Sequence, residues 1–187
     1  RLRVFTNLTG FNRPYHLAAG NLNADGFPDL AIANYSGSSV SVLLGSGNGA
    51  FQLGTNIAMI NTAEGLAIGD LNADGKSDLA VCVYGASAVC VLSGNGAGGF
   101  QITTNLPVGS APRFVQIGDV TGSSAPDLVV LRPDGAILSA TSEYPRDAML
   151  RIKSRDGRLV GLGKSLFDSS QIARLGGAGL SIAVDPL

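Results

Sequence analysis

Short apolar runs alternate with polar, glycine-rich turns along the first 140 residues. The runs at 30–33, 79–83 and 128–131 are apolar at consecutive positions, which is typical of strands buried on both faces. Three further sets of apolar runs follow, at 40–44 and 89–92, at 51–53 and 100–102, and at 66–68 and 115–117. The pattern predicts an all-β chain in which four short strands recur.

A segment rich in aspartate and asparagine precedes each buried run. NLNADGFPD at 21–29 returns as DLNADGKSD at 70–78, and a degenerate copy, DVTGSSAPD, occupies 119–127. Both offsets are 49 residues, since 70 − 21 and 119 − 70 agree. Of the 36 positions in 21–56, 20 are identical in 70–105, so the sequence contains a true internal repeat.

Four strands in 49 residues match the size of one β-propeller blade. We predict a partial β-propeller of about three four-stranded blades, with another β-repeat architecture, such as a parallel β-helix, as the alternative. Residues 141–187 depart from the pattern and are expected to form a divergent blade or a separate C-terminal segment. Within residues 1–140, the repeat units fall at about 2–50, 51–99 and 100–140.

Composition and charge narrow the class of protein. The chain is 45% hydrophobic and 14% charged, with a net charge of −1, which argues against nucleic-acid binding because such proteins carry a concentrated basic face. No apolar run approaches the roughly 18 residues that a membrane-spanning helix needs. Three blades would leave outer faces without a neighbour. We therefore expect self-association, or that the chain is part of a longer propeller.

The two cysteines, Cys82 and Cys90, flank a short turn. A hairpin centred on Ala86 would place them opposite each other on one face of the sheet. The sequence leaves two interpretations open: a cross-strand disulfide, or two small buried side chains.

The repeat resembles a known family at specific positions. Each complete copy has an apolar strand and a glycine, then the pattern Asp/Asn-x-Asn-x-Asp-Gly-x-x-Asp, then Leu-Ala-Ile/Val, and later a Gly-Asn-Gly turn before Phe51 or Phe100. This pattern is similar to the FG-GAP/VCBS repeats of integrin α-chain propellers over about residues 2–138. The resemblance implies a β-propeller, bound calcium, and a secreted or cell-surface location, extracellular or periplasmic.

The two complete aspartate-rich loops are candidate calcium sites. Calcium takes six to eight oxygen ligands, and a tight loop with oxygen-bearing side chains at alternate positions can surround one ion. The twelfth position, a glutamate in EF-hands, is Ile32 or Val81 here, so the ninth-position aspartate must complete the shell, as the resemblance implies. The expected ligands are Asn21, Asn23, Asp25, the carbonyl of Phe27, and Asp29 in the first loop, and Asp70, Asn72, Asp74, the carbonyl of Lys76, and Asp78 in the second.

The third loop is degenerate. It retains Asp119, Thr121 and Asp127 as candidate ligands, but Ser123 stands where the central aspartate is expected and Ser124 where glycine is expected. A loop held by its own hydroxyl hydrogen bonds is the favoured interpretation.

The sequence favours binding over catalysis. His16 is the sole histidine, and no sequence signal places a serine or an aspartate beside it. We expect a non-enzymatic, calcium-binding extracellular module for adhesion or for binding a protein or glycan. A non-catalytic accessory part of a larger secreted enzyme, or a spacer, is the alternative.

Overall fold

The computed structural model describes residues 8–109, 111–119, 125–133, 137–141, 150–154, 159–163 and 180–182. Every strand pairing among them is antiparallel. The one helical element in these ranges is a short 3₁₀ turn, η1 (Tyr84–Ala86). The all-β prediction is confirmed, and a parallel β-helix is excluded for the described residues.

Two four-stranded sheets repeat the same antiparallel meander. In each sheet, neighbouring strands follow one another along the chain, in the orders β1-β2-β3-β4 and β5-β6-β7-β8. The first sheet contains β1 (Pro14–Gly20), β2 (Asp29–Asn34), β3 (Ser39–Gly45) and β4 (Phe51–Ala58). The second contains β5 (Ala63–Gly69), β6 (Asp78–Val83), β7 (Ala88–Gly94) and β8 (Phe100–Pro107).

Two three-stranded sheets follow. The third sheet has the order β11-β10-β9 and consists of β9 (Phe114–Gly118), β10 (Asp127–Leu131) and β11 (Ile137–Thr141). The fourth has the order β13-β12-β14 and consists of β12 (Leu150–Ser154), β13 (Leu159–Gly163) and β14 (Leu180–Ile182). The strands of residues 150–182 thus belong to the segment in which the sequence repeat is no longer visible.

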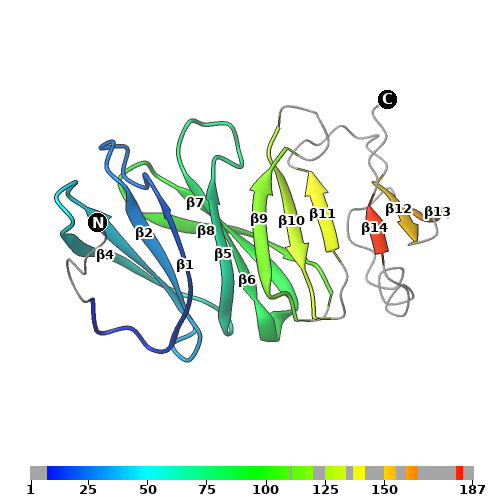
Figure 1. Ribbon diagram of the computed structural model, residues 1–187, viewed down its shortest axis with the longest axis horizontal. Helices are drawn as coiled ribbons and strands as arrows, with labels where there is room; N and C mark the ends of the chain where they lie inside the picture. Colours follow the sequence, from blue (N-terminus) through cyan, green and yellow to red (C-terminus); the bar gives the residue numbers. More distant parts are fainter. Residues whose placement is uncertain are drawn as a thin grey trace, which may run out of the picture.

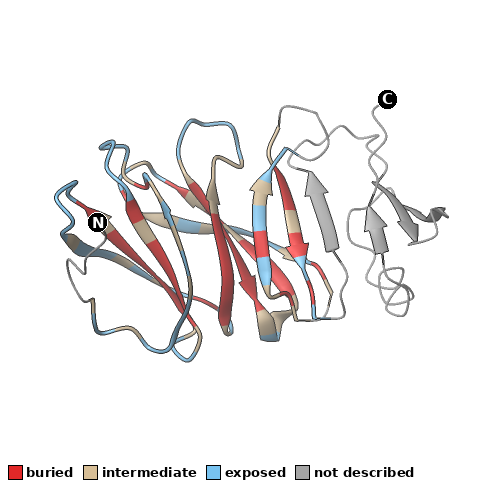
Figure 2. Ribbon diagram, viewed as in Figure 1, coloured by how far each residue is buried: buried red, intermediate tan, exposed pale blue. Residues whose placement is uncertain are grey.

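The first three sheets stand side by side as successive blades (Figure 1). Their first strands lie next to one another, β1 beside β5 and β5 beside β9. One core, containing Val40, Leu79 and Val81, lies between the first and second sheets. A second core, containing Val89, Val115 and Val130, lies between the second and third. Figure 2 shows that burial is concentrated in inner strands such as β3 and β6, whereas β1 and β4 are largely exposed. The arrangement is a partial propeller, as the sequence predicts, with two four-stranded blades and a third blade of which three strands are described.

The sheets are offset from the units into which the sequence was divided. The first two sheets span 14–58 and 63–107, so each begins 12 residues after its unit (14 − 2 and 63 − 51). The strand after each Gly-Asn-Gly turn forms a local hairpin with the preceding strand, β4 with β3 and β8 with β7. A repeat has a period but no intrinsic starting point, and hairpin pairing sets the starting point of the sheet.

The register of the β6–β7 hairpin separates the two cysteines. Cys82 lies opposite Val89, and Cys90 lies opposite Val81. The loop between the strands contains four residues, 84–87, so its centre lies half a residue before Ala86 and the two side chains point to opposite faces. Cys82 belongs to the second core and Cys90 to the first, and both are free thiols. The disulfide interpretation was wrong, and the small-buried-residue interpretation is confirmed.

Candidate metal centre

The two complete aspartate-rich loops join the first and second strands of their sheets and share one backbone conformation. Residues 21–28 connect β1 to β2, and residues 70–77 connect β5 to β6. Ala24 and Ala73 have φ angles of 61° and 59°, and Gly26 and Gly75 have φ angles of 87° and 80°. A left-handed alanine costs on the order of 1–2 kcal/mol. Its presence at the same place in both loops means that a common set of contacts holds them.

In the second loop, three side chains bind the loop's own main chain. Asp70 accepts hydrogen bonds from the N–H groups of Asp74 (3.2 Å) and Gly75 (2.8 Å). Asn72 Oδ1 accepts from Asp74 N at 2.9 Å, and Asp74 Oδ1 accepts from Lys76 N at 2.9 Å. These bonds gather oxygen atoms from the first, third and fifth loop positions around one short stretch of backbone.

The first loop repeats part of this arrangement with fewer charges. Asp25 N donates to Asn23 Oδ1 at 3.2 Å, and Phe27 N donates to Asp25 Oδ1 at 2.8 Å. The Asn23 amide also donates to Asp25 Oδ2 at 2.8 Å. Asn21 is exposed and supplies an amide where the second loop has the Asp70 carboxylate.

The ninth-position aspartates have a structural role that the sequence did not predict. Asp29 and Asp78 are buried. Asp29 accepts from the N–H of Leu22 at 2.7 Å and of Gly45 at 2.8 Å. Asp78 does the same with Leu71 and Gly94, at 2.9 Å each. Each carboxylate therefore fastens its loop to the glycine-rich turn of the same blade, and its remaining lone pairs leave capacity for a cation.

In the third loop, Asp119 is exposed and Asp127 is buried. The third candidate ligand, Thr121, lies outside the described residues. A metal site in this loop therefore stays a prediction.

The donor chemistry of the two complete loops fits calcium. All the candidate donors are carboxylate, amide or carbonyl oxygens, the ligands that calcium takes, and none is a sulfur or imidazole nitrogen. In the described part of the chain, no three His, Cys, Asp or Glu side chains form a cluster able to hold a metal, so amide and carbonyl oxygens would have to contribute. The Lys76 main-chain N–H lowers the pKa of the exposed Asp74 carboxyl, and the Lys76 ammonium, 3.4 Å from Asp74 Oδ2, adds to this effect.

The first loop is also bound to the next blade. Ser77 Oγ, in the second loop, donates to the carbonyl of Asn21 at 2.8 Å. The N–H of Gly98, in the second glycine-rich turn, donates to the carbonyl of Leu22 at 3.1 Å. Sequence reasoning missed both contacts, because it treated each loop as a separate site.

A group of residues at the start of the first strands was also missed. Arg113 Nη1 lies 3.0 and 3.1 Å from the two carboxylate oxygens of Glu64, which is buried. The Tyr15 hydroxyl also lies beside Arg113. Tyr15, Glu64 and Arg113 occupy one position of the 49-residue repeat (15 + 49 = 64 and 64 + 49 = 113). The sequence signal that could have revealed this group was an acidic and a basic residue at the same position of neighbouring repeats.

The FG-GAP-like repeat family matches residues 21–81 and 70–130. Together the two matches cover 21–130, more than half of the 187 residues. The chain belongs to the FG-GAP-like repeat family. This assignment agrees with the aspartate-rich loops, the four-stranded sheets and the 49-residue period.

The other comparisons add little. No curated protein matches the chain. One solved structure, described as "Crystal structure of BBS1N in complex with ARL6DN, soaked with lead", is 14% identical, with a TM-score of 0.35 over 72% of this chain. The aligned part spans 52% of that protein, about half of its length. This similarity is too low to inform the function.

Among the described residues, no helix has the length and the apolar composition that crossing a membrane requires.

Proposed function

We propose that this FG-GAP-repeat chain is a calcium-binding, extracellular β-propeller module that binds a protein or a glycan. The observation that supports calcium is the pair of matched loops, which share left-handed alanines and oxygen-bearing side chains at the same positions. FG-GAP repeats are typical of extracellular proteins, which supports the location. Millimolar extracellular calcium would suit sites of modest affinity.

The proposed ligands are those expected from the sequence. A bound ion would supply positive charge to carboxylates that otherwise repel one another within each loop. Because the ligands come together only in the folded chain, binding would stabilise the fold by about 2.7 kcal/mol at a hundredfold excess of calcium over Kd. The residues are Asn21, Asn23, Asp25, Phe27 and Asp29 in the first loop, and Asp70, Asn72, Asp74, Lys76 and Asp78 in the second.

We also propose that the module binds and does not catalyse. The imidazole of His16 is engaged structurally, because its Nδ1 accepts a hydrogen bond from the N–H of Leu66 at 3.3 Å. The ring also lies edge-on to Phe114, with a centroid distance of 5.8 Å. These contacts give His16 a packing role between blades.

Isothermal titration of the chelator-stripped chain with calcium tests the metal sites. We expect about two ions per chain and a higher melting temperature with calcium than with a chelator. Asp74→Ala should weaken binding more than Asp25→Ala, since the second loop carries three carboxylates and the first two. Lys76→Ala is the matched control: it keeps the main-chain carbonyl and removes a competing ammonium, so affinity should hold or rise. Neither heat nor a melting shift in millimolar calcium would contradict the proposal.

A further inference from the structure

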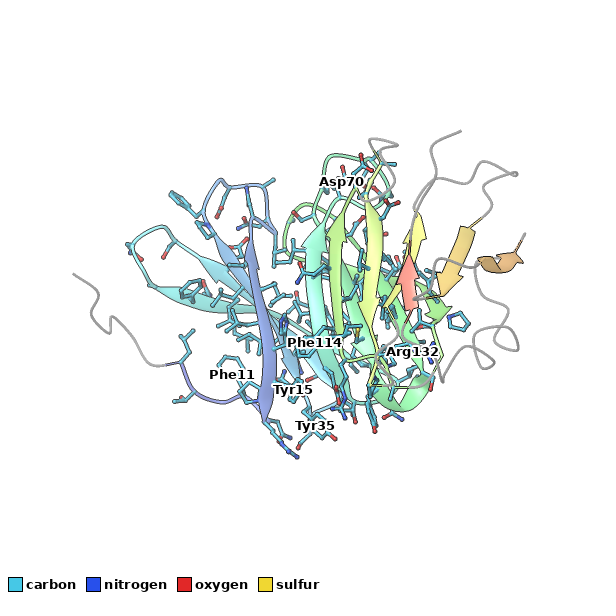
Figure 3. All side chains as sticks on the ribbon, turned by 45° about the vertical axis from the view of Figure 1, so that its right-hand side comes forward. Phe11, Tyr15, Tyr35, Asp70, Phe114 and Arg132 are labelled. Atoms are coloured by element: carbon cyan, nitrogen blue, oxygen red, sulfur yellow. The ribbon has the colours of Figure 1, made fainter. Side chains whose placement is uncertain are left out.

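Three of the four tyrosines gather at the end of the sheets opposite the aspartate-rich loops. Tyr15 lies near the start of β1, Tyr35 follows β2, and Tyr84 follows β6, while Tyr144 lies outside the described residues. Figure 3 shows Tyr15 and Tyr35 at the opposite end from Asp70. We call this surface the tyrosine–arginine end and define it by six residues: Arg13, Tyr15, Tyr35, Tyr84, Arg113 and Phe114.

The rings of this end are held in place before any partner arrives. Tyr15 and Tyr35 have ring centroids 5.8 Å apart. The Arg13 guanidinium lies 4.5 Å from the centre of the Tyr35 ring, and that of Arg113 lies 4.7 Å from the centre of the Tyr84 ring. Ordered aromatic side chains lose little conformational entropy on binding, which favours affinity.

Internal packing does not account for the whole cluster. Tyr15 and Phe114 are 43% and 41% exposed. Arg13 is exposed and has a φ angle of 53°, an unfavourable conformation for a side-chain-bearing residue. The equivalent residue two repeats later, Ala111, has a φ angle of 51°, so this conformation recurs in the repeat, and the exposure of the two rings is what suggests an interaction surface.

The two arginines differ in charge balance. Arg113 is paired with the buried Glu64, so its charge is compensated inside the fold. Arg13 makes no ion pair with any carboxylate in the described part of the chain. The tyrosine–arginine end therefore presents one uncompensated guanidinium, which favours an anionic partner.

The neighbouring apolar side chains favour a protein over a polysaccharide. Ile60, in the β4–β5 connection, is 64% exposed, and Leu131, opposite Phe114, is 42% exposed. Exposed aliphatic side chains beside tyrosine, phenylalanine and arginine match the composition of protein interface cores.

We propose that the tyrosine–arginine end binds an acidic, partly apolar segment of a partner protein. Apolar side chains of the segment pack on Tyr15 and Phe114, and a carboxylate pairs with Arg13. The inference rests on the proposed function as a binding module, but it does not require calcium.

Selection of a displayed random peptide library on the full chain tests the inference. We expect the selected peptides to combine aspartate or glutamate with apolar residues. By fluorescence anisotropy, Arg13→Gln and Tyr15→Ala should each weaken binding of a selected peptide by about tenfold. Leu53→Ala, which changes an exposed apolar residue on β4 away from this end, should have no effect. Replacing the peptide's acidic residue by its amide should weaken binding to the parent chain and not to Arg13→Gln.

Several results would overturn the inference: no peptide selected, selected peptides without acidic residues, or binding unchanged by both variants. Binding of polygalacturonate that is lost in the same variants would assign the surface to acidic glycans instead. Thermal melting shows whether each variant is folded, and Arg13→Gln changes only an exposed side chain. Calcium titration of the same sample separates the two proposals, because it succeeds or fails independently of peptide binding.

Discussion

Tyr15, Glu64 and Arg113 show how equivalent residues acquire different roles in a repeat protein. They occupy one repeat position, and in the structure Arg113 interacts with both of the others across the blades. Burial raises the pKa of Glu64, and the Arg113 charge opposes this shift. The Arg113 guanidinium therefore offsets part of the cost of burying the Glu64 carboxylate.

Replacing Glu64 by glutamine should destabilise the fold. Arg113 would lose its charged partner at a partly buried site, and we expect the free energy of unfolding to fall by about 1–3 kcal/mol. A double-mutant cycle with Arg113→Gln in denaturant unfolding measures the coupling. Strict additivity of the two single changes would contradict a direct interaction.

His16 should make stability depend on pH. Burial lowers its pKa below 6.5, and a protonated Nδ1 cannot accept the Leu66 N–H bond. The unfolded chain therefore takes up the proton first, and stability should fall as pH drops below about 6.5. His16→Phe keeps an aromatic ring beside Phe114 and removes the titration. The difference in melting temperature between the two proteins should change between about pH 7 and pH 5; a constant difference would count against this role.

At the scale of elements, each aspartate-rich loop and the glycine-rich turn of the same blade form one unit. Asp78 joins them by accepting from Leu71 and Gly94, as Asp29 does with Leu22 and Gly45. A side chain at Gly94 would overlap the carbonyl oxygen of Ser77, so this glycine is required for close approach.

Gly94→Ala should therefore separate the turn from the loop. We expect a loss of about 2–4 kcal/mol in chemical denaturation, together with weaker calcium binding if the second loop is a metal site. Gly118→Ala is the matched control, because an added Cβ there meets no atom within 4 Å. Equal stability of the two variants would show that the turn adapts.

The elements themselves were largely predictable from the sequence, whereas their register was not. Apolar runs predicted the strands, because a strand buried on both faces has apolar residues at consecutive positions, as in β6. The pairing of Cys82 depends on whether the turn holds an odd or an even number of residues, and glycine-rich turns tolerate both. The sequence singled out Asp78 as a metal ligand, but a metal ligand and a main-chain hydrogen-bond acceptor need the same residue type. Its contacts with Leu71 and Gly94 became visible only in the fold.

At the scale of the molecule, the blades converge along their first strands. His16 on β1 reaches Phe114 on β9, and the equivalent position on the intervening β5 is Gly65 (16 + 49 = 65). A Cβ at Gly65 would overlap the backbone of Arg113 and Phe114. The absence of a side chain at this one position lets three strands meet.

Gly65→Ala should loosen the third sheet from the second. We expect limited proteolysis to cut first between residues 107 and 133 in this variant, while the first two sheets, which share their own core, stay protected. The same digestion of Gly118→Ala should follow the parent chain. A cleavage pattern that begins within 14–58 would show that the contact does not position the third sheet.

The Glu64–Arg113 pair also bears on the history of the chain. A duplication begins with identical copies, and identical copies would place glutamate beside glutamate or arginine beside arginine at this position. Divergence after duplication therefore made the copies different at this position, with glutamate in the second copy and arginine in the third. Exchanging the order of the second and third repeats, while keeping every residue, would place the arginine at the buried position of Glu64 and the glutamate at the more exposed position of Arg113. The order of the repeats is thus inherited information in its own right, separate from their content.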